Sequence, residues 1–312
     1  MRVSVVIPNW NGLQMLRECF PTVYGEIQSH RPEDEIIVAD DASSDDSVPF
    51  LREHFPDVNI VQAEGNLGFG KMCNLGIRKA QNEIVILLNN DIKAQGDFVT
   101  SCLKYFEHND TFAVTFQSLA EDGKTFREGA KKIGLKMGLP FVKHAQRDES
   151  RRNSEGEIYS LYAAGGHCAV SRSKFLELGG FDAIYHPFYW EDTDLCYRAW
   201  KRGWKIYYEP KCVVVHKHMG TIRNTFPGKR IKKIKSRNRI LFTWCNFSRH
   251  ILLIHHIPFM FWRFLTEIFL CHVDFYAGLL GAFRKLSAVK ERRKREKNLA
   301  EVSDNEILKL FA

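Results

Sequence analysis

Amide, carboxylate and imidazole side chains occur where two apolar stretches end, and these residue types suit a cation site. Asn89, Asn90 and Asp91 follow one stretch, and a carboxylate beside amides can bind a hard divalent cation shared with phosphate groups. His216 ends the stretch CVVVH, and a histidine near acidic clusters is a candidate metal ligand. His218, two residues further on, is expected on the same face of the strand.

The segment Tyr189-Trp190-Glu191-Asp192-Thr193-Asp194 places three acids within four residues at the start of an expected helix. Acidic residues there partly serve the helix dipole. Asp194 can also pair with Arg198, four residues on. These explanations account for Asp194 better than for Asp192, which therefore remains a candidate for chemistry.

Asp41 and a glycine-rich segment have the features of a nucleotide site. Asp40 and Asp41 follow an apolar stretch, where a carboxylate can accept from a base or ribose; a turn role is equally compatible. The segment 64–71 contains Asn66 and Gly68, and glycines let backbone approach an anion closely. The first apolar stretch leads into Pro8 and Asn9 with only Gly12 nearby, so the GxGxxG turn of dinucleotide-binding proteins is absent.

These residues must be positioned by alternating strands and helices. Short β-branched stretches are typical of buried parallel strands, and they predict an α/β fold with a doubly wound, mostly parallel sheet. Ligands bind such sheets beyond the carboxyl ends of the strands. The segment 117–158 is polar and predicts an irregular insertion or loop. The expected strands are 3–7, 35–39, 58–62, 83–88, 112–116, 160–171, 205–209 and 212–216, and the expected helices are 13–24, 47–55, 69–80, 97–107, 173–178 and 191–202.

Composition and charge favour a catalytic domain with a basic tail. The 312 residues are 45% hydrophobic and 26% charged, which excludes disordered, collagen-like and coiled-coil chains. Eight cysteines without a CxxC pair predict reduced thiols rather than disulfides or structural zinc. Residues 229–297 hold 17 Lys and Arg against 4 Asp and Glu, whereas the rest of the chain carries a net −5. We therefore expect one domain over 1–225 and an amphipathic helical tail over 226–312.

The tail has the pattern of a segment that associates with an anionic membrane surface without spanning it. Residues 229–239 are rich in Lys and Arg, and 240–283 are rich in Phe, Trp, Leu and Ile. Arg249, Arg263 and Glu267 interrupt the uncharged window that a spanning helix needs. Interfacial helices tolerate such a mixture. The alternative is that the aromatic residues pack on the catalytic domain. Nucleic acid is not an expected partner.

The ordered set VSVVIPNWNG, VADDASSDDS, NLGFGKMCNLGI, LLNND, GGFD, YWEDTDLCYRAWKRGW and VVVHKH resembles the inverting glycosyltransferases of family 2, which have the GT-A fold. The resemblance covers about residues 1–220. It is strongest to the bacterial rhamnosyltransferase-like branch, which builds surface polysaccharides.

The resemblance implies a role for each matching residue. Asp192 is the expected catalytic base. Asp91 and His216 are the expected ligands of Mg²⁺ or Mn²⁺ bridging the donor diphosphate, although Asn89 stands where many members carry Asp. The remaining residues are expected to contact either the nucleotide sugar (Pro8, Asn9, Asp41, Asn66, Gly68, Asn90 and Asp91) or the acceptor (Gly165, Gly166, Trp190 and Glu191).

The implied activity is metal-dependent, inverting transfer of a sugar, by a hexosyltransferase or rhamnosyltransferase-like enzyme. The donor would be a nucleotide-diphosphate sugar and the acceptor a hydroxyl of a glycan, itself lipid-linked. The expected location is the cytoplasm, peripheral on the inner face of the cytoplasmic membrane. Two alternatives stay open: a transferase that uses polyprenyl phosphate as acceptor, and a non-catalytic carbohydrate- or membrane-binding scaffold.

Overall fold

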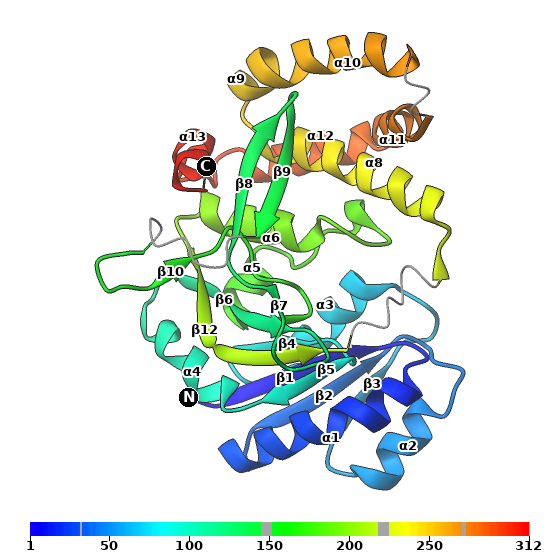
Figure 1. Cartoon of the computed structure of the whole chain (residues 1–312), viewed down its shortest axis with the longest axis vertical. Helices are drawn as coiled ribbons and strands as arrows, with labels where there is room; N and C mark the ends of the chain where they lie inside the picture. The colour runs from blue at the N-terminus through cyan, green and yellow to red at the C-terminus, as the bar shows by residue number, and fades with distance from the viewer. Residues whose placement is uncertain (32, 145–151, 218–224, 270–272, 312) are drawn as a thin grey trace.

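A mixed, mostly parallel β-sheet forms the centre of the molecule, as seen in the computed structural model (Figure 1). The structure describes residues 1–31, 33–144, 152–217, 225–269 and 273–311. The strand order is β10-β12-β6-β11-β4-β1-β2-β3, with β5 beside β12 and β7 beside β6. The strands are β1 (Val3–Asn9), β2 (Glu35–Asp40), β3 (Asn59–Gln62), β4 (Ile84–Leu88), β5 (Ile92–Gln95), β6 (Thr111–Leu119), β7 (Phe126–Glu128), β10 (Ile158–Tyr159), β11 (His167–Ser171) and β12 (Lys205–His216).

Helices cover both faces of the sheet because alternate side chains of each strand point to opposite faces. In β1, Val3, Val5 and Ile7 belong to a cluster with helix α1, whereas Val6 contributes to the cluster on the other face with α3. The helices up to the end of the sheet region are α1 (Leu13–His30), α2 (Ser47–His54), α3 (Phe69–Lys79), α4 (Phe98–Leu103), α5 (Arg172–Glu177) and α6 (Glu191–Lys201).

The predicted strands and helices are largely confirmed, with three differences. Only 167–171 of the expected strand 160–171 is extended, and it runs antiparallel between β4 and β6. The two expected strands 205–209 and 212–216 form one strand, β12, with a register shift between Glu209 and Val213. Strand β5 was not predicted, because its sequence IKAQ lacks an apolar run.

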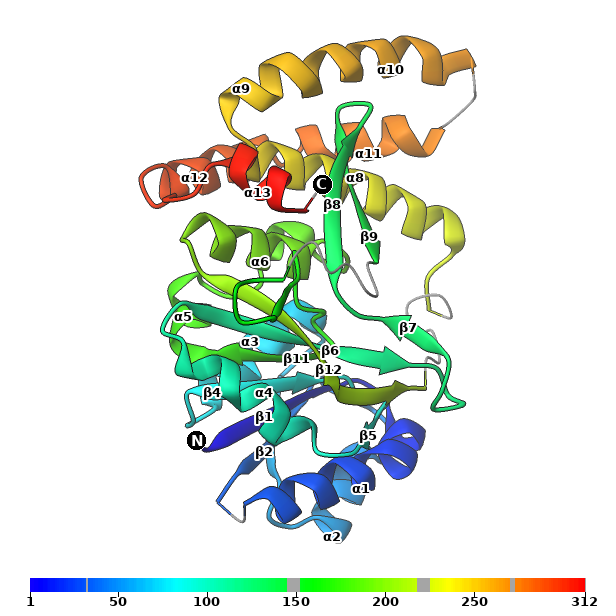
Figure 2. The ribbon, with the colours of Figure 1, turned by 60° about the vertical axis from the view of Figure 1, so that its left-hand side comes forward.

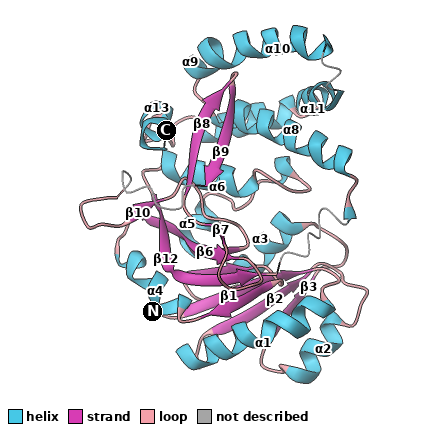
Figure 3. Cartoon of the chain, in the orientation of Figure 1, coloured by secondary structure: helices cyan, strands magenta, loops and turns pink. Residues whose placement is uncertain are grey.

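The prediction of an irregular 117–158 segment is wrong for most of its described part. Strands β8 (Lys131–Lys136) and β9 (Leu139–His144) form an antiparallel hairpin, which extends from the sheet toward the C-terminal helices (Figures 2 and 3). Its two-residue turn, Met137-Gly138, has positive φ at both positions, 50° and 72°. Positive φ at both central residues is the property of a type I′ turn, whose twist matches the paired strands.

The C-terminal segments stack on α6 and on the hairpin, on the side away from the central sheet (Figure 1). The tip of the hairpin is fixed there, because His256 Nδ1 donates to Gly138 O at 2.7 Å while Trp244 Nε1 donates to His256 Nε2 at 2.8 Å. The segments are α8 (Gly228–Asn246), α9 (Arg249–Ile251), a π-helical turn (Leu252–His256), α10 (Ile257–Phe269), α11 (Val273–Phe283), α12 (Leu286–Glu296) and α13 (Asp304–Phe311).

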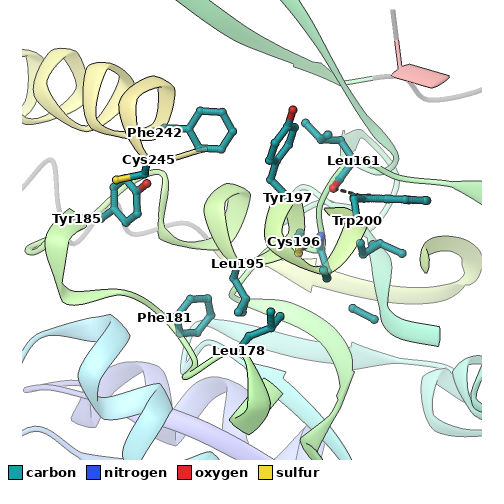
Figure 4. Packing of buried hydrophobic residues seen from close by; sticks show 14 of the residues in the cluster. Leu161, Leu178, Phe181, Tyr185, Leu195, Cys196, Tyr197, Trp200, Phe242 and Cys245 are labelled. Carbon is teal, nitrogen blue, oxygen red and sulfur yellow. Dashed lines mark hydrogen bonds between the residues drawn. The ribbon is translucent and has the colours of Figure 1, made fainter. Parts of the chain in front are cut away.

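A buried apolar cluster joins α6 to this C-terminal layer. Leu195, Cys196 and Tyr197 of α6 lie between the loop residue Phe181 and Phe242 of α8 (Figure 4). The seven cysteines in the described part of the chain are all free and buried, which agrees with the expected reduced thiols.

Charged groups are buried in the same layer. Asp194 is fully buried and accepts from Arg198 Nε at 2.9 Å, as the i, i+4 spacing predicts, and from Arg292 Nη2 of α12 at 3.0 Å. Asn246 and the Tyr185 hydroxyl also donate to it. Four donors around one carboxylate hold the pKa of Asp194 down, at about 2, against the burial that alone would raise it. The carboxylate therefore stays ionised and ties α6 to α8 and α12.

Within the described residues, none of the helices combines the length and the apolar character that crossing a membrane requires.

Candidate active site

One cavity of about 1010 Å³ opens beyond the carboxyl ends of β1, β2 and β4. Its wall also contains residues from the start of α6 and from α8. The structure brings together every residue that the sequence predicted for the site. These residues are Pro8, Asn9, Asp41, Asn66, Gly68, Asn90, Asp91, Gly165, Gly166, Trp190, Glu191, Asp192 and His216.

The strand ends β1 and β2 form one end of the cavity. Asp41 is buried, and its two carboxylate oxygens accept from the backbone N–H groups of Leu67 and Gly68 at 2.6 and 2.8 Å. These bonds hold the glycine-rich loop against β2. Gly68 has φ of 81°, a conformation that glycine adopts without strain. A carboxylate has about four acceptor sites, so Asp41 can accept a further donor from a ligand.

The amides of Asn9 and Asn90 bridge the ends of β1 and β4. Asn90 Nδ2 donates to Asn9 Oδ1 at 2.8 Å, and Asn9 Nδ2 donates to Asp40 Oδ1 at 2.9 Å. Asp40 also accepts from Ser43, so its role is to hold the β2 turn. A Cβ on Gly12 would lie 2.2 Å from Asn90 Nδ2, which explains why the turn needs a glycine there.

Asp91 and His216 form a pair suited to a divalent cation. His216 Nε2 lies 3.1 and 3.2 Å from the two carboxylate oxygens of Asp91. Asp91 Oδ1 is buried and receives no hydrogen bond of good geometry from the described residues. A buried carboxylate oxygen that lacks a well-formed hydrogen bond can be satisfied by a bound cation. A carboxylate and an imidazole beside open space fit Mg²⁺ or Mn²⁺, since these ions take further ligands from phosphate and water. His218 lies outside the described residues.

Asn89, which stands where many members of the resembling family carry Asp, also lines the cavity. It lies against β11, where a Cβ on Gly166 would be 2.4 Å from Asn89 Nδ2. Gly166 is therefore small because the Asn89 amide occupies the adjoining space. Gly165 is less constrained, because a Cβ there would meet the Phe69 ring at 3.4 Å.

Glu191 and Asp192 line the cavity from the first turn of α6. Tyr189 and Trp190, which lead into this helix, have φ of 71° and 78°. Non-glycine residues adopt such values rarely, and clusters of them occur at functional sites. Trp190 packs on Phe242 of α8, with ring centres 5.0 Å apart. The strained turn thus fixes the two carboxylates toward the cavity.

The environments of the two carboxylates differ. Burial raises the pKa of both, and the two groups also interact with each other. Asp192 Oδ1 accepts from the Thr193 N–H at 2.6 Å, and the buried Lys131 further opposes the rise. Glu191 Oε2 is buried without a hydrogen bond from the described residues. The pKa of Glu191 is thereby raised to about 8, and because Asp192 has the groups that oppose its rise, a proton shared by the pair is held more readily by Glu191.

The cavity also contains groups that sequence reasoning missed. Glu128 ends β7 and His167 begins β11, and both line the wall. Burial would raise the pKa of Glu128, but His167 and Lys131 more than offset this and lower it to about 2. Burial lowers the pKa of His167 to about 3. Neither residue follows the carboxyl end of a parallel strand. The expectation that ligand-binding residues lie at those ends therefore could not identify them. From α8 and the residues before it come Phe226, Arg230, Lys235 and Arg237.

The chain belongs to glycosyl transferase family 2, whose family model matches residues 4–179. It is 26% identical over 266 residues to N-acetylgalactosaminyltransferase 6 of Drosophila melanogaster, covering 81% of this chain and 40% of that protein. It is also 26% identical over 240 residues to the O-antigen chain rhamnosyltransferase RfbN of Salmonella typhimurium, covering 72% of this chain and 69% of that protein. The chain spans less than half the length of the fruit-fly relative.

Solved structures share the fold. GalNAc-T7 with UDP, GalNAc and Mn²⁺ superposes with a TM-score of 0.62 at 17% identity, over 80% of this chain and 49% of that one. The mannosyltransferase PcManGT of Pyrobaculum calidifontis, in complex with GDP-Man and Mn²⁺, superposes with a TM-score of 0.54 at 16% identity, over 99% of this chain and 83% of that one. The predicted GT-A fold is therefore confirmed.

Proposed function

We propose that this protein transfers a sugar from a nucleotide-diphosphate donor to an acceptor hydroxyl, with inversion and with the help of a divalent cation. The observation that carries the proposal is the arrangement of one cavity. Asp91 and His216 offer metal ligands in one part of its wall, and Asp192 offers a carboxylate in another. Relatives that are named glycosyltransferases support the same reaction class.

The proposed reaction is a direct displacement. Asp192 accepts the proton of the acceptor hydroxyl while the acceptor oxygen forms a bond to the anomeric carbon. The bond from that carbon to the diphosphate oxygen breaks, and its electron pair leaves with the nucleoside diphosphate. A cation held by Asp91 and His216 would neutralise charge on the leaving diphosphate. A positioned base of this kind contributes about 10²- to 10⁴-fold to the rate.

The other parts of the wall bind and orient the substrates in this proposal. Asp41 and the backbone around Asn66 and Gly68 receive the nucleoside, with Pro8, Asn9 and Asn90 beneath it. Trp190 presents an aromatic face on the acceptor side, and protonated Glu191 can donate to an acceptor oxygen. Gly165 and Gly166 leave room beside them.

The test is turnover of defined donors by the purified protein. UDP-N-acetylgalactosamine, UDP-N-acetylglucosamine, GDP-mannose and dTDP-rhamnose are each incubated with Mn²⁺, and release of the nucleoside diphosphate is followed. We expect slow release from one donor even with water as acceptor, and loss of that release on chelation. If no donor is bound or cleaved, with or without Mn²⁺, the proposed function is wrong.

We further propose that α10 and α11 hold the enzyme on an anionic membrane surface, where a lipid-linked glycan is presented. Phe261 is 67% exposed and Trp262 is 60% exposed, and apolar neighbours on these helices are exposed as well. Large exposed apolar patches mark interaction sites. The basic residues of α8, among them Arg230 at the cavity rim, would be attracted to anionic lipid at about 1 kcal/mol each. The corresponding location is peripheral, on the inner face of the cytoplasmic membrane. The exposed residues are Leu253, Ile254, Ile257, Phe259, Phe261, Trp262, Phe264, Leu265, Leu280 and Phe283.

Point substitutions test this better than truncation, because the C-terminal helices also supply buried core residues such as Phe242. The double variant Phe261→Ser, Trp262→Ser is compared with the wild type in sedimentation with vesicles of phosphatidylglycerol and phosphatidylethanolamine. Leu299→Ser, at a residue 45% exposed outside α10 and α11, is the matched control. We expect the double variant alone to lose vesicle binding. Unchanged sedimentation of the double variant would refute the membrane assignment.

A further inference from the structure

His167 is an exception to the rule that buried polar groups find partners. It is 2% exposed, and neither of its ring nitrogens makes a hydrogen bond to any described residue. A neutral imidazole offers one donor and one acceptor. Leaving such groups buried and unsatisfied costs about 1 to 3 kcal/mol each. Because His167 lines the cavity, a bound ligand could satisfy both nitrogens.

Glu128 stands beside His167 and completes a polar group in the wall. Its Oε2 lies 3.8 Å from His167 Nε2 and 3.7 Å from Lys131 Nζ, distances too long for hydrogen bonds. Lys131 is fully buried and lies over the Tyr162 ring at 4.9 Å. Lys131 is one of the groups that lower the pKa of Glu128, and the Glu128 side chain remains 36% exposed.

This polar group lies close to the proposed cation site. The rings of His167 and His216 are 6.0 Å apart, which places His167 next to the proposed cation site. Glu128 in turn is close enough to Asp192 for its charge to raise the pKa of that carboxyl. In a direct displacement the donor sugar must lie between the leaving diphosphate and the attacking hydroxyl. His167 and Glu128 therefore face the space that the sugar ring would occupy.

We propose that His167 and Glu128 bind hydroxyl groups of the donor sugar and so select which sugar is transferred. The proposal rests on the function proposed above and identifies the part of the donor that this wall recognises. A sugar hydroxyl donates to the Glu128 carboxylate, and a hydroxyl oxygen accepts from the His167 N–H. The substrate class is a nucleotide-activated sugar with a free hydroxyl on the edge facing β7 and β11. A deoxy sugar would leave both protein groups buried and unpaired, the arrangement that discriminates most strongly against an analogue.

The test separates recognition of the sugar from recognition of the nucleotide. Binding of UDP, GDP and dTDP, and of the donors named above, is measured by calorimetry with Mn²⁺ for the wild type, His167→Leu and Glu128→Gln. We expect the dissociation constant of the preferred nucleotide sugar to rise at least about tenfold in each variant. The dissociation constant of the corresponding nucleoside diphosphate should change less than about twofold. His54→Leu, at an exposed histidine of α2, is the matched control and should change neither constant.

Two further measurements keep the result unambiguous. His167→Leu should melt at or above the wild-type temperature, because it removes unsatisfied buried polar atoms; a large fall would show that the ring is held by the protein and would overturn the proposal. Wild-type protein should also lose affinity for one monodeoxy analogue of its donor, and Glu128→Gln, whose amide oxygen still accepts but carries no charge, should discriminate against that analogue less strongly. An equal loss of nucleotide and nucleotide-sugar binding would assign His167 to the cation site and contradict sugar recognition.

Failure of the wild type to bind any nucleotide would instead overturn the proposed function, and this inference with it.

Discussion

Asp192 and Asp194 lie two residues apart on one helix, and the same substitution should have opposite consequences at the two positions. Asp194→Asn removes the negative charge that Arg198 and Arg292 share, and leaves two guanidinium groups in the interior with less compensation. Asp192→Asn removes a charge whose burial is unfavourable, because burial raises the pKa of that carboxyl. We therefore expect Asp194→Asn to unfold more easily and Asp192→Asn to be as stable as the wild type or more so.

The magnitude for Asp194 follows from two features of the structure. Its pKa is lowered from 3.8 to about 2, and at about 1.36 kcal/mol per pKa unit this favours the ionised folded state by about 2 kcal/mol. Breaking a buried ion pair by removing one partner costs about 3 to 5 kcal/mol. A loss of about 2 to 5 kcal/mol corresponds to a fall in Tm of about 3 to 8 °C for a chain of this size.

The assay is thermal and urea unfolding of both variants at pH 7, with the wild type also measured between pH 5 and pH 2. A depressed carboxyl pKa contributes stability that is fully present above the unfolded value, here 3.8, and that is lost as the pH falls toward 2. The wild type should lose that contribution across this window, and Asp194→Asn should lose less. Equal Tm values for Asp194→Asn and the wild type at pH 7 would refute the assigned role of the buried network.

Three further predictions concern the cavity. Asp192→Asn should lower kcat by at least about 10²-fold with little change in donor affinity, and near-normal turnover of the folded variant would contradict its role as base. His216→Ala should weaken Mn²⁺ binding in the presence of a nucleoside diphosphate by at least about tenfold, measured by electron paramagnetic resonance, and unchanged affinity would remove His216 from the cation site. Glu191→Gln should raise Tm at pH 8 but not at pH 4, because a raised carboxyl pKa penalises the folded state increasingly above 4.5. No gain in Tm at pH 8 would show that Glu191 is ionised without cost.

The predicted site was found from one physical rule, that parallel strands deliver their carboxyl ends to the same edge of a sheet. Asp41 is far in sequence from Asn90 and Asp91, yet the parallel register of β1 with β2 and β4 brings them to one cavity. Asp192 and His216 were candidates from an acidic cluster and a strand end, and the resemblance supplied their roles as base and metal ligand. Their positions in the cavity agree with that assignment, although their roles remain predictions.

The hairpin and the polar group beside it could not be predicted, for reasons visible in the residues. Strand β8 begins with two lysines, and one of these, Lys131, is fully buried, which no hydrophobic pattern indicates. The turn uses Met137 at a positive φ where Asn or Asp is usual, so the local signal of a type I′ turn is missing. His167 begins β11, which runs antiparallel to β4. It therefore reaches the cavity at the amino end of its strand rather than at the carboxyl end.

The buried network around Asp194 also limits when α6 can complete its packing during biosynthesis. Arg292 lies 98 residues downstream of Asp194, and at about 5 to 20 residues per second the ribosome needs about 5 to 20 s to deliver it. During that interval the sheet can form, but α6 lacks one of the cations that make its burial favourable. The helix that bears Asp192 can therefore reach its final packing only late in synthesis. Slower elongation over this stretch should prolong exposure of the apolar surface of α6 to chaperones.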